Sequence, residues 1–485
     1  MQSLLSILLS PFTAAVAAVR WCAKASLAAR ITWIVALFQF VVVVLAAIVV
    51  LRTGDRAVLQ SWWSPGKGLA LLLLIVLVPW LVYQAARLWL EHQGGRWPDI
   101  AAAWSAAVAE LGRQQIMLTE SPLFLVLGSD GGQLERSLLG DTPTPLVVTQ
   151  SPAGGGPLHV YASRDAIFVC CSGAGQTALA AAAVKAASVD GTAVGVELDP
   201  ADAAASAWQP MARQTLSPRT AKERRDASDR LAYACIQLLQ ARIPLAAVNG
   251  VVVLLPLQVN RDGDADADAA SVGQAVGEDL ATVIRVLGVR APVTLVAGVL
   301  QEDPAIDDLL TRLDASKRDA ACGQAVPPGL PPTPEHLHAL AYNATGPLMD
   351  MLAELLLDPR RIADQPANRH LLAMLGRLRL HVGTQLAQLL PQAFSPDLHR
   401  GADGHSADLP LLAGCYVAAL SAAPGRRAFG RGMLEAVIQV QGELDWTDDS
   451  LRANRWAGRV SRILFAAAAV MVAAIVTIVW WSLSR

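Results

Sequence analysis

Charged residues are scarce in this sequence. Asp, Glu, Lys and Arg make up 16% of the 485 residues, whereas soluble domains carry roughly 25%. The 41 acidic and 39 basic residues nearly cancel, and the resulting net charge of −2 excludes a globally basic nucleic-acid-binding protein. We therefore expect no nucleic acid among the partners. Because 53% of the residues are hydrophobic and the mean hydropathy is +0.39, membrane spans are the first feature to search for.

The six cysteines have no recognisable pattern. The sequence contains no Cys-x-x-Cys pair, and no Cys/His spacing is typical of a zinc site. Cys170-Cys171 instead predicts two buried small residues on a strand. We therefore expect no disulfide framework and no metal site, and the thiols favour a reducing compartment.

Three apolar runs are long enough to cross a bilayer core of about 30 Å. They cover residues 31–51, 69–86 and 463–483, and the segment 1–19 before them is typical of an interfacial amphipathic helix. Four arginines precede the third run and only Arg485 follows it, which favours a cytoplasmic N-terminus, a C-terminus on the far side and a cytoplasmic location for most of the chain. These arginines are Arg452, Arg455, Arg459 and Arg462.

Short apolar runs alternate with helical patterns between the second and third predicted spans, which predicts a mostly parallel α/β sheet. We expect strands at 122–127, 145–148, 159–162, 166–171, 248–255 and 292–296, and helices at 97–113, 133–139, 222–242 and 271–287.

A proline-rich segment, 323–334, is the best candidate for a linker. After it we expect only helices, at 335–357, 368–390 and 429–441, and no strand. The predicted domains are an N-terminal segment with a two-span hairpin (1–96), an α/β domain (97–322), the linker (323–334), a helical extension (335–462) and a third span (463–483).

A glycine-rich turn follows the first predicted strand of the α/β domain. The sequence Gly128-Ser129-Asp130-Gly131-Gly132 lies between a strand and a helix, which is the setting of a phosphate-binding loop. Backbone N–H groups around Gly128, Gly131 and Gly132 are the candidate nucleotide contacts. The competing interpretation, a tight turn that connects the strand to the helix, is the one we favour.

Several segments in this order resemble the IcmF/TssM family of type VI secretion proteins. They are Pro122–Leu139, Ala166–Ser172, Pro244–Leu255, Leu287–Val293, and Phe394 with Ala413–Tyr416. The resemblance implies a bacterial inner-membrane protein with a P-loop-GTPase-like cytoplasmic domain, a helical extension and three transmembrane helices, with the C-terminus in the periplasm. It also implies a large periplasmic domain, and we expect the chain, which stops at Arg485, to lack it.

The residues that handle nucleotide in that family are replaced here. A phosphate-binding loop needs Lys for the phosphates and Ser or Thr for Mg²⁺, but Leu134 and Glu135 occupy these positions. Cys171 replaces the family's Asp, and Val299 and Gln301 replace its base-reading Lys and Asp. We therefore expect no catalytic residue and no cofactor, with GTP or ATP binding as the less favoured alternative.

The sequence thus predicts a non-catalytic inner-membrane scaffold of a type VI-like secretion system that acts within a multi-protein complex. The expected partners are the lipid bilayer, a DotU/TssL-like membrane protein and baseplate components, as the resemblance implies. One alternative is a membrane-tethered NTPase whose phosphate-binding lysine lies elsewhere, at Lys185 or Lys222. Another is a membrane protein unrelated to secretion that uses the same fold to bind partners.

Overall fold

The computed structural model divides the chain into two units, and each is considered by itself. One unit is Trp97–Ala453, and the other combines Met1–Arg96 with Asn454–Arg485. The structure describes residues 35–36, 38–39, 77–84, 96–129, 131, 133–183, 220–242, 245–255, 257, 265–298, 305–358, 365–399, 408–420, 426–456 and 459.

The prediction of transmembrane helices is wrong for the part of the chain that the structure describes. No helix there is both long enough and apolar enough to cross a bilayer, which also contradicts the multi-pass inner-membrane location. The longest, α10 (Ala265–Leu287) and α13 (Pro334–Leu356), have 23 residues each, but both carry charged residues along their length. The predicted spans 31–51, 69–86 and 463–483 lie outside the described residues except at 35–36, 38–39 and 77–84.

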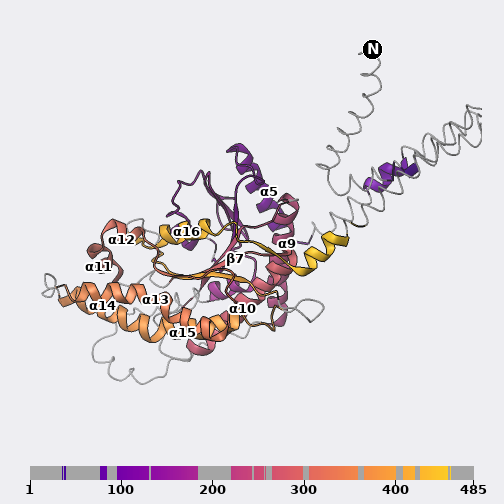
Figure 1. Cartoon of the computed structure of the whole chain (residues 1–485). Coiled ribbons are helices and arrows are strands. Elements are labelled where there is room, and N and C mark those ends of the chain that lie inside the picture. The colour runs from indigo at the N-terminus through magenta and orange to yellow at the C-terminus, as the bar shows by residue number, and fades with distance from the viewer. Residues whose placement is uncertain are drawn as a thin grey trace, which may run out of the picture. The chain divides into compact units, whose positions relative to one another are not determined.

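The unit 97–453 is built on a mixed eight-stranded sheet, in agreement with the predicted α/β class. The strand order is β2-β3-β4-β1-β5-β7-β9-β8 (Figure 1). The five strands from β4 to β9 in this order are parallel, and β2, β3 and β8 are antiparallel to their neighbours. The strands are β1 (Leu123–Leu127), β2 (Val148–Ser151), β3 (His159–Ala162), β4 (Ile167–Cys170), β5 (Gly250–Leu255), β7 (Pro292–Ala297), β8 (Gly323–Ala325) and β9 (Leu411–Val417). A separate two-stranded sheet joins β6 (Val289–Arg290) to β10 (Asp445–Trp446).

The central strands are buried on both faces, which is why they are apolar without alternation. Side chains of β1 alternate between two cores, as the period of a strand requires. Leu125 packs in the larger core with helices α5, α9, α10, α13 and α15, whereas Phe124 packs in the smaller core with α6 and α16.

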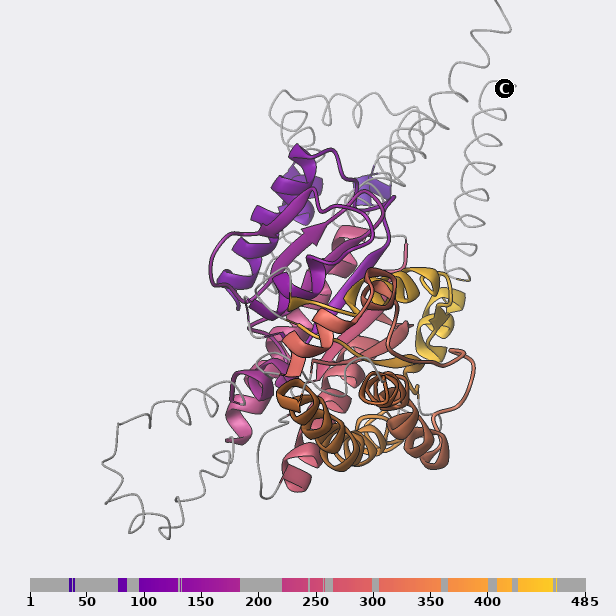
Figure 2. The same cartoon turned by 90° about the vertical axis from the view of Figure 1, so that its left-hand side faces the viewer.

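Helices therefore cover both faces of the sheet, and α13, α14 and α15 form an additional layer over α10 (Figures 1 and 2). The predicted helices at 97–113, 133–139 and 222–242 are confirmed, and α10 begins six residues before its predicted start. The other helix bounds are α5 (Pro98–Arg113), α6 (Gln133–Leu139), α9 (Ala221–Arg242), α11 (Ala305–Arg312), α12 (Ala315–Asp319), α14 (Gln365–Arg377), the π-helical turn η2 (Leu378–Val382), α15 (Gly383–Ala393) and α16 (Gly430–Gln439).

The expectation that no strand follows the proline-rich segment is wrong. β8 begins at the start of that segment, and β9 lies within the predicted helical extension. β9 is a short apolar run buried on both faces, and such a run has no hydrophobic period that distinguishes a strand from a buried helix. β8 has three residues and no apolar pattern, so only its pairing with β9 identifies it as a strand.

Candidate functional site

The glycine turn after β1 is the strand–turn–helix element that the sequence predicts. Gly128 has φ +78°, and a Cβ there would lie 2.2 Å from the carbonyl oxygen of Leu254 and 2.9 Å from Thr177 Cγ2. Gly131 has φ +86°, whereas Gly132, the third candidate residue, lies outside the described residues. Glycine at 128 is therefore required by both backbone conformation and close packing on β5.

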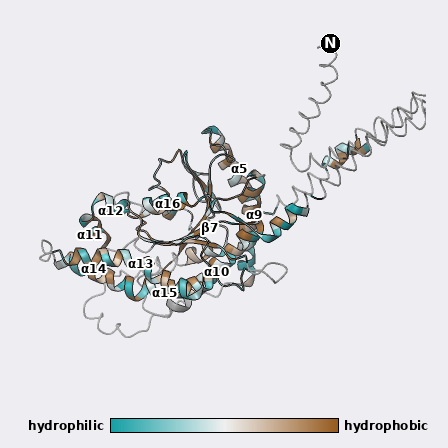
Figure 3. Ribbon diagram, viewed as in Figure 1, coloured by the Kyte–Doolittle hydropathy of each residue, from teal (hydrophilic) through white to brown (hydrophobic). Residues whose placement is uncertain are grey.

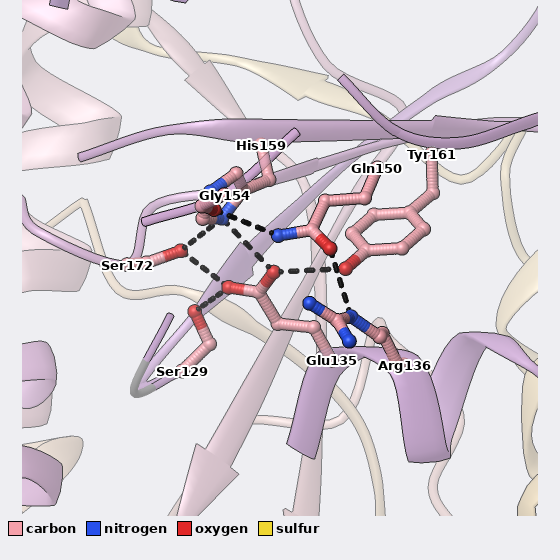
Figure 4. A network of polar contacts seen from close by, with 8 residues as sticks. All are labelled: Ser129, Glu135, Arg136, Gln150, Gly154, His159, Tyr161 and Ser172. Atoms are coloured by element: carbon pink, nitrogen blue, oxygen red, sulfur yellow. Dashed lines mark hydrogen bonds and ion pairs between the residues drawn. The ribbon is translucent and has the colours of Figure 1, made fainter. Parts of the chain in front are cut away.

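The interior of this turn holds the carboxylate of Glu135. Glu135 lies in the first turn of α6 and is fully buried. The hydroxyl of Ser129 donates to its Oε1 atom at 2.6 Å, and the hydroxyl of Ser172 donates to the same atom (Figure 4). The hydroxyl of Tyr161 donates to Oε2 at 3.2 Å. The buried Glu135 carboxylate is thus the centre of a polar network.

His159 of β3 lies against the Glu135 carboxylate in this network. Its Nδ1 atom lies 3.2 Å from Glu135 Oε2 and 3.0 Å from Ser172 Oγ, and its Nε2 atom lies 2.9 Å from the carbonyl oxygen of Gly154. Because a carbonyl only accepts, Nε2 carries hydrogen. The Nδ1 atom thus faces both Ser172 and Glu135, and its contact with the Glu135 carboxylate is an ion pair when both ring nitrogens carry hydrogen.

These contacts determine the charge of the site. Burial raises the pKa of Glu135, but hydrogen bonds from His159, Ser129 and Ser172, with the charge of His159, outweigh it and hold the pKa below its ordinary value. Burial and the neighbouring Glu135 raise the pKa of Tyr161, which keeps its hydroxyl protonated and donating. All polar atoms of the Glu135 carboxylate and the His159 ring face partners within the protein.

A second buried carboxylate lies beside the loop that follows β4. Asp279 of α10 is fully buried, and its two oxygens accept the backbone N–H groups of Gln176 and Thr177, each at 2.8 Å. These N–H groups open the helix 176–183, so the carboxylate occupies the position where a helix N-terminus binds an anion. Gly175 has φ +101°, and a Cβ there would lie 2.7 Å from Asp279 Oδ2, so only glycine permits this approach. Burial raises the pKa of Asp279 to about 6, against the lowering effect of the two N–H donors.

The loop after β4 is also held from α9. Arg230 Nε donates to the carbonyl oxygen of Gly173 at 2.9 Å, and the same guanidinium pairs with Asp99 and lies 4.8 Å from the centroid of the Trp97 ring. Gln176 donates to Ser228 at 3.0 Å and to Glu278. Side chains from α5, α9 and α10 thus fix both sides of the loop.

The combination of Ser172, His159 and Glu135 contains the residue types of a hydrolase triad, but its geometry does not fit one. In a triad, one imidazole nitrogen faces the serine and the other faces the carboxylate. Here Ser172 and Glu135 both face Nδ1, and Nε2 is bound to a backbone carbonyl. His159 is also fully buried, so it cannot exchange a proton with a substrate at the surface.

The structure brings only some of the sequence-predicted residues to this site. Leu134 packs against the smaller core, and Cys171 is buried in the larger one. Val299, Gln301 and Lys185 lie outside the described residues, and Lys222 is exposed in the first turn of α9.

Sequence reasoning missed the three residues that complete the Glu135 network, Tyr161, His159 and Ser172, and also Asp279, the second buried carboxylate. A usable signal existed for one of them, because His159 stands in a short apolar strand and a buried polar side chain needs a partner. Asp279 gave no comparable signal, because it stands on a helix and contacts residues that lie more than 100 positions earlier.

Comparisons with known proteins add no identity. No family model, no curated protein and no solved structure matches this chain. The resemblance described from the sequence therefore depends only on the segments quoted for it.

Proposed function

We propose that the unit 97–453 is a docking module that performs no bond chemistry, and that it acts in a type VI-like secretion apparatus. The observation that carries the first part is that two anion positions at the carboxyl ends of the parallel strands each hold a buried carboxylate of the protein itself. Glu135 fills the turn after β1, and Asp279 caps the helix after β4. The second part follows from the resemblance to IcmF/TssM, together with its implied partners, a DotU/TssL-like protein and baseplate components.

The electrostatics of the turn oppose phosphate binding. A phosphate charge 4 Å from the Glu135 carboxylate would be repelled by about 4 kcal/mol at an effective dielectric constant of about 20. Moving Glu135 out of the turn would leave the buried polar groups of Ser129, Ser172 and His159 without the carboxylate that they contact, and each unsatisfied buried group costs about 1–3 kcal/mol. The replacement of the family's Lys by Leu134 also removes the positive charge that would offset these costs.

Nucleotide binding and turnover by the full-length protein test the non-catalytic part. We expect no saturable change in the fluorescence of mant-GTP or mant-ATP with Mg²⁺ present, and no phosphate release above that of buffer. Saturable binding with Mg²⁺-dependent turnover would overturn the proposal and favour the NTPase alternative.

Co-purification tests the docking part. The tagged full-length protein is purified from its own host in mild detergent, and the proteins that remain bound are identified by mass spectrometry. Recovery of a DotU/TssL-like protein or of baseplate components supports the secretion assignment. A preparation that contains none of them contradicts it.

A further inference from the structure

An exposed stripe of leucine and arginine runs along the outer helical layer. α14, η2 and α15 form one continuous helix, because Arg377 and Gly383, which flank the π-helical turn, both have helical φ and ψ. Leu372 is 60% exposed and Leu380 is 66% exposed, although both are large apolar side chains. We define the α14 stripe as the exposed or half-exposed residues on this side of the helix: Arg369, Leu372, Ala373, Gly376, Arg379 and Leu380.

The π-helical turn brings the two leucines of the α14 stripe into line. Eight positions separate Leu372 from Leu380, which in a regular helix would leave them about 80° apart. A π turn takes up about one extra residue, so the separation acts as about seven positions, close to two full turns. The opposite side of the same helix, with Leu371, Met374 and Leu378, is buried in the core. The helix therefore carries leucines on two sides, and the described residues cover only one of them. Figure 3 shows the mixture of hydrophobic and hydrophilic residues along α14.

The charge of this helix has one sign. Residues 365–393 contain three arginines and two histidines but no Asp or Glu. Arg369 and Arg379, at the two ends of the α14 stripe, are exposed, and among the described residues neither has an acidic partner. By contrast, Arg312 of α11 donates to Asn368 of α14 at 2.7 Å.

From the apolar centre and the cationic ends of the α14 stripe we infer that it docks an acidic amphipathic helix of a partner protein. Such a helix would place apolar side chains at i, i+3, i+4 and i+7 against Leu372 and Leu380, and carboxylates against Arg369 and Arg379. The α14 stripe is about 16 Å long from Arg369 to Leu380, which matches about three turns of the docked helix.

The same observations disfavour two other occupants. A second copy of the chain would bring arginines against arginines, because the α14 stripe contains no acid to pair with them. An anionic lipid surface is bound by clusters of about four to eight basic residues, whereas this stripe has two, separated by about 15 Å along the helix. The inference rests on the proposed docking function, because it names the chemistry of one partner.

A designed peptide tests the α14 stripe in the full-length protein. The probe is a fluorescein-labelled 18-residue helix with leucine on one face and glutamate along its flanks, and its match carries lysine instead of glutamate. In fluorescence polarisation at physiological salt, we expect the glutamate peptide to bind at least tenfold more tightly than the lysine peptide. The double variant R369E/R379E should reverse this preference, and the double variant L372E/L380E should abolish the binding of both.

Two matched variants control for non-specific effects. Met117→Glu changes an exposed apolar residue outside the helical layer, and Arg164→Glu changes an exposed arginine on the β3–β4 turn. Neither should alter peptide binding, and circular dichroism should show that every variant is folded. Equal affinities for the two peptides, or unchanged binding by R369E/R379E, overturn the inference.

The remaining outcomes identify another occupant. The α14 stripe binds lipid if the protein does not bind the peptide but co-sediments with phosphatidylserine–phosphatidylcholine vesicles (1:3), and if R369E/R379E abolishes that co-sedimentation. The stripe binds a second copy of the chain if sedimentation velocity shows self-association that L372E/L380E abolishes. Either result overturns the inference. If every secretion protein that co-purifies with the wild type also co-purifies with L372E/L380E, the α14 stripe is not the binding site for these partners, but the proposed function stands.

Discussion

Glu135 and His159 form a pair in which both side chains are fully buried. Replacing Glu135 by Gln keeps the size of the side chain but removes the negative charge beside the imidazole and presents an amide N–H₂ group to hydroxyl donors. Breaking a buried pair in this way costs about 3–5 kcal/mol. We expect Glu135→Gln to lower the urea midpoint by a corresponding amount, with the slope of the transition unchanged.

Exposed Glu120 provides the control for this substitution. Glu120→Gln should change the free energy of unfolding by less than about 0.5 kcal/mol. The double variant Glu135→Gln/His159→Gln should lose less stability than the sum of its single variants, since the second change removes a charge that the first left unpaired. Strict additivity would show that the two side chains are not a coupled pair.

Asp279 makes stability depend on pH in the direction opposite to that of Glu135. Its pKa rises from 3.8 to about 6 on folding, so its contribution to stability is full below about pH 4 and is lost as the pH rises through about 6. The loss is about 3 kcal/mol at most. The contribution of Glu135, whose pKa is lowered on folding, is instead lost as the pH falls below the ordinary range of a glutamate.

Urea unfolding of the wild type and Asp279→Asn at about pH 4.5 and pH 6.5 isolates this effect. We expect the wild type to exceed Asp279→Asn in stability by more at pH 4.5 than at pH 6.5, because only the wild type loses the contribution of a protonated carboxyl as the pH rises. The asparagine side chain does not titrate, so its contribution to the stability of the variant is the same at both pH values. A difference that does not vary between the two pH values would contradict the raised pKa of Asp279.

At the residue scale, the sequence shows that Leu134 and Glu135 do not have the chemistry of a phosphate-binding loop, because each motif position carries a defined chemistry. The network around Glu135 could not be recognised, because it joins β3, α6 and the loop after β4, and no spacing along the chain encodes such a meeting. The sequence identified Glu135 only as a departure from the motif, whereas in the structure its carboxylate organises the turn.

At the element scale, the turn from β1 to α6 depends on the backbone of Gly128. Alanine there would adopt an unfavourable positive φ, which costs about 1–2 kcal/mol, and its Cβ would overlap the carbonyl oxygen of Leu254. We expect Gly128→Ala to lower the free energy of unfolding by about 3 kcal/mol or more, measured by urea titration.

Gly112 is the matched control within another element. It lies in α5 without a positive φ, and a Cβ added there would have no neighbouring atom within 4 Å. Gly112→Ala should therefore stabilise the protein by about 0.5–1 kcal/mol, since alanine is the better helix former. Similar effects of the two substitutions would mean that the turn after β1 does not constrain residue 128.

The elements that the sequence predicted correctly are those with a strong local signal. α5 begins at a proline, and α9 has a long run of helix-forming residues. β9 was missed because its residues, LLAGCYV, are apolar on both faces and include a glycine, and because it follows three helices. Its strand conformation comes from its position beside β7, with which it pairs in parallel over the length of β7, with one register shift between Val293 and Thr294. Tertiary contacts, which one sequence does not reveal, decide such a segment.

At the scale of the whole molecule, the residues after the proline-rich segment complete the sheet and its cover. β9 inserts between β7 and β8, and α15 packs on α10 at very short range. A Cβ on Gly273 would lie 2.5 Å from the carbonyl oxygen of Leu389, and one on Gly277 would lie 2.9 Å from that of Ala393. The glycines of α10 thus allow α15 to approach closely, which makes the two parts of the unit interdependent.

This arrangement predicts how fragments of the unit behave. A fragment 97–322 would expose the backbone of β7 as a long apolar edge and leave the α10 face without α15. We expect it to lack a cooperative urea transition, whereas the fragment 97–453 should unfold in one transition with native-like near-ultraviolet circular dichroism. Adding the separate fragment 323–453 to 97–322 should restore part of that signal, because the missing strands and helices bind where they normally pack. A cooperative transition in 97–322 alone would show that the α/β part folds without the segment that follows it, and the part of the sheet from β2 to β7 would then be its independent core.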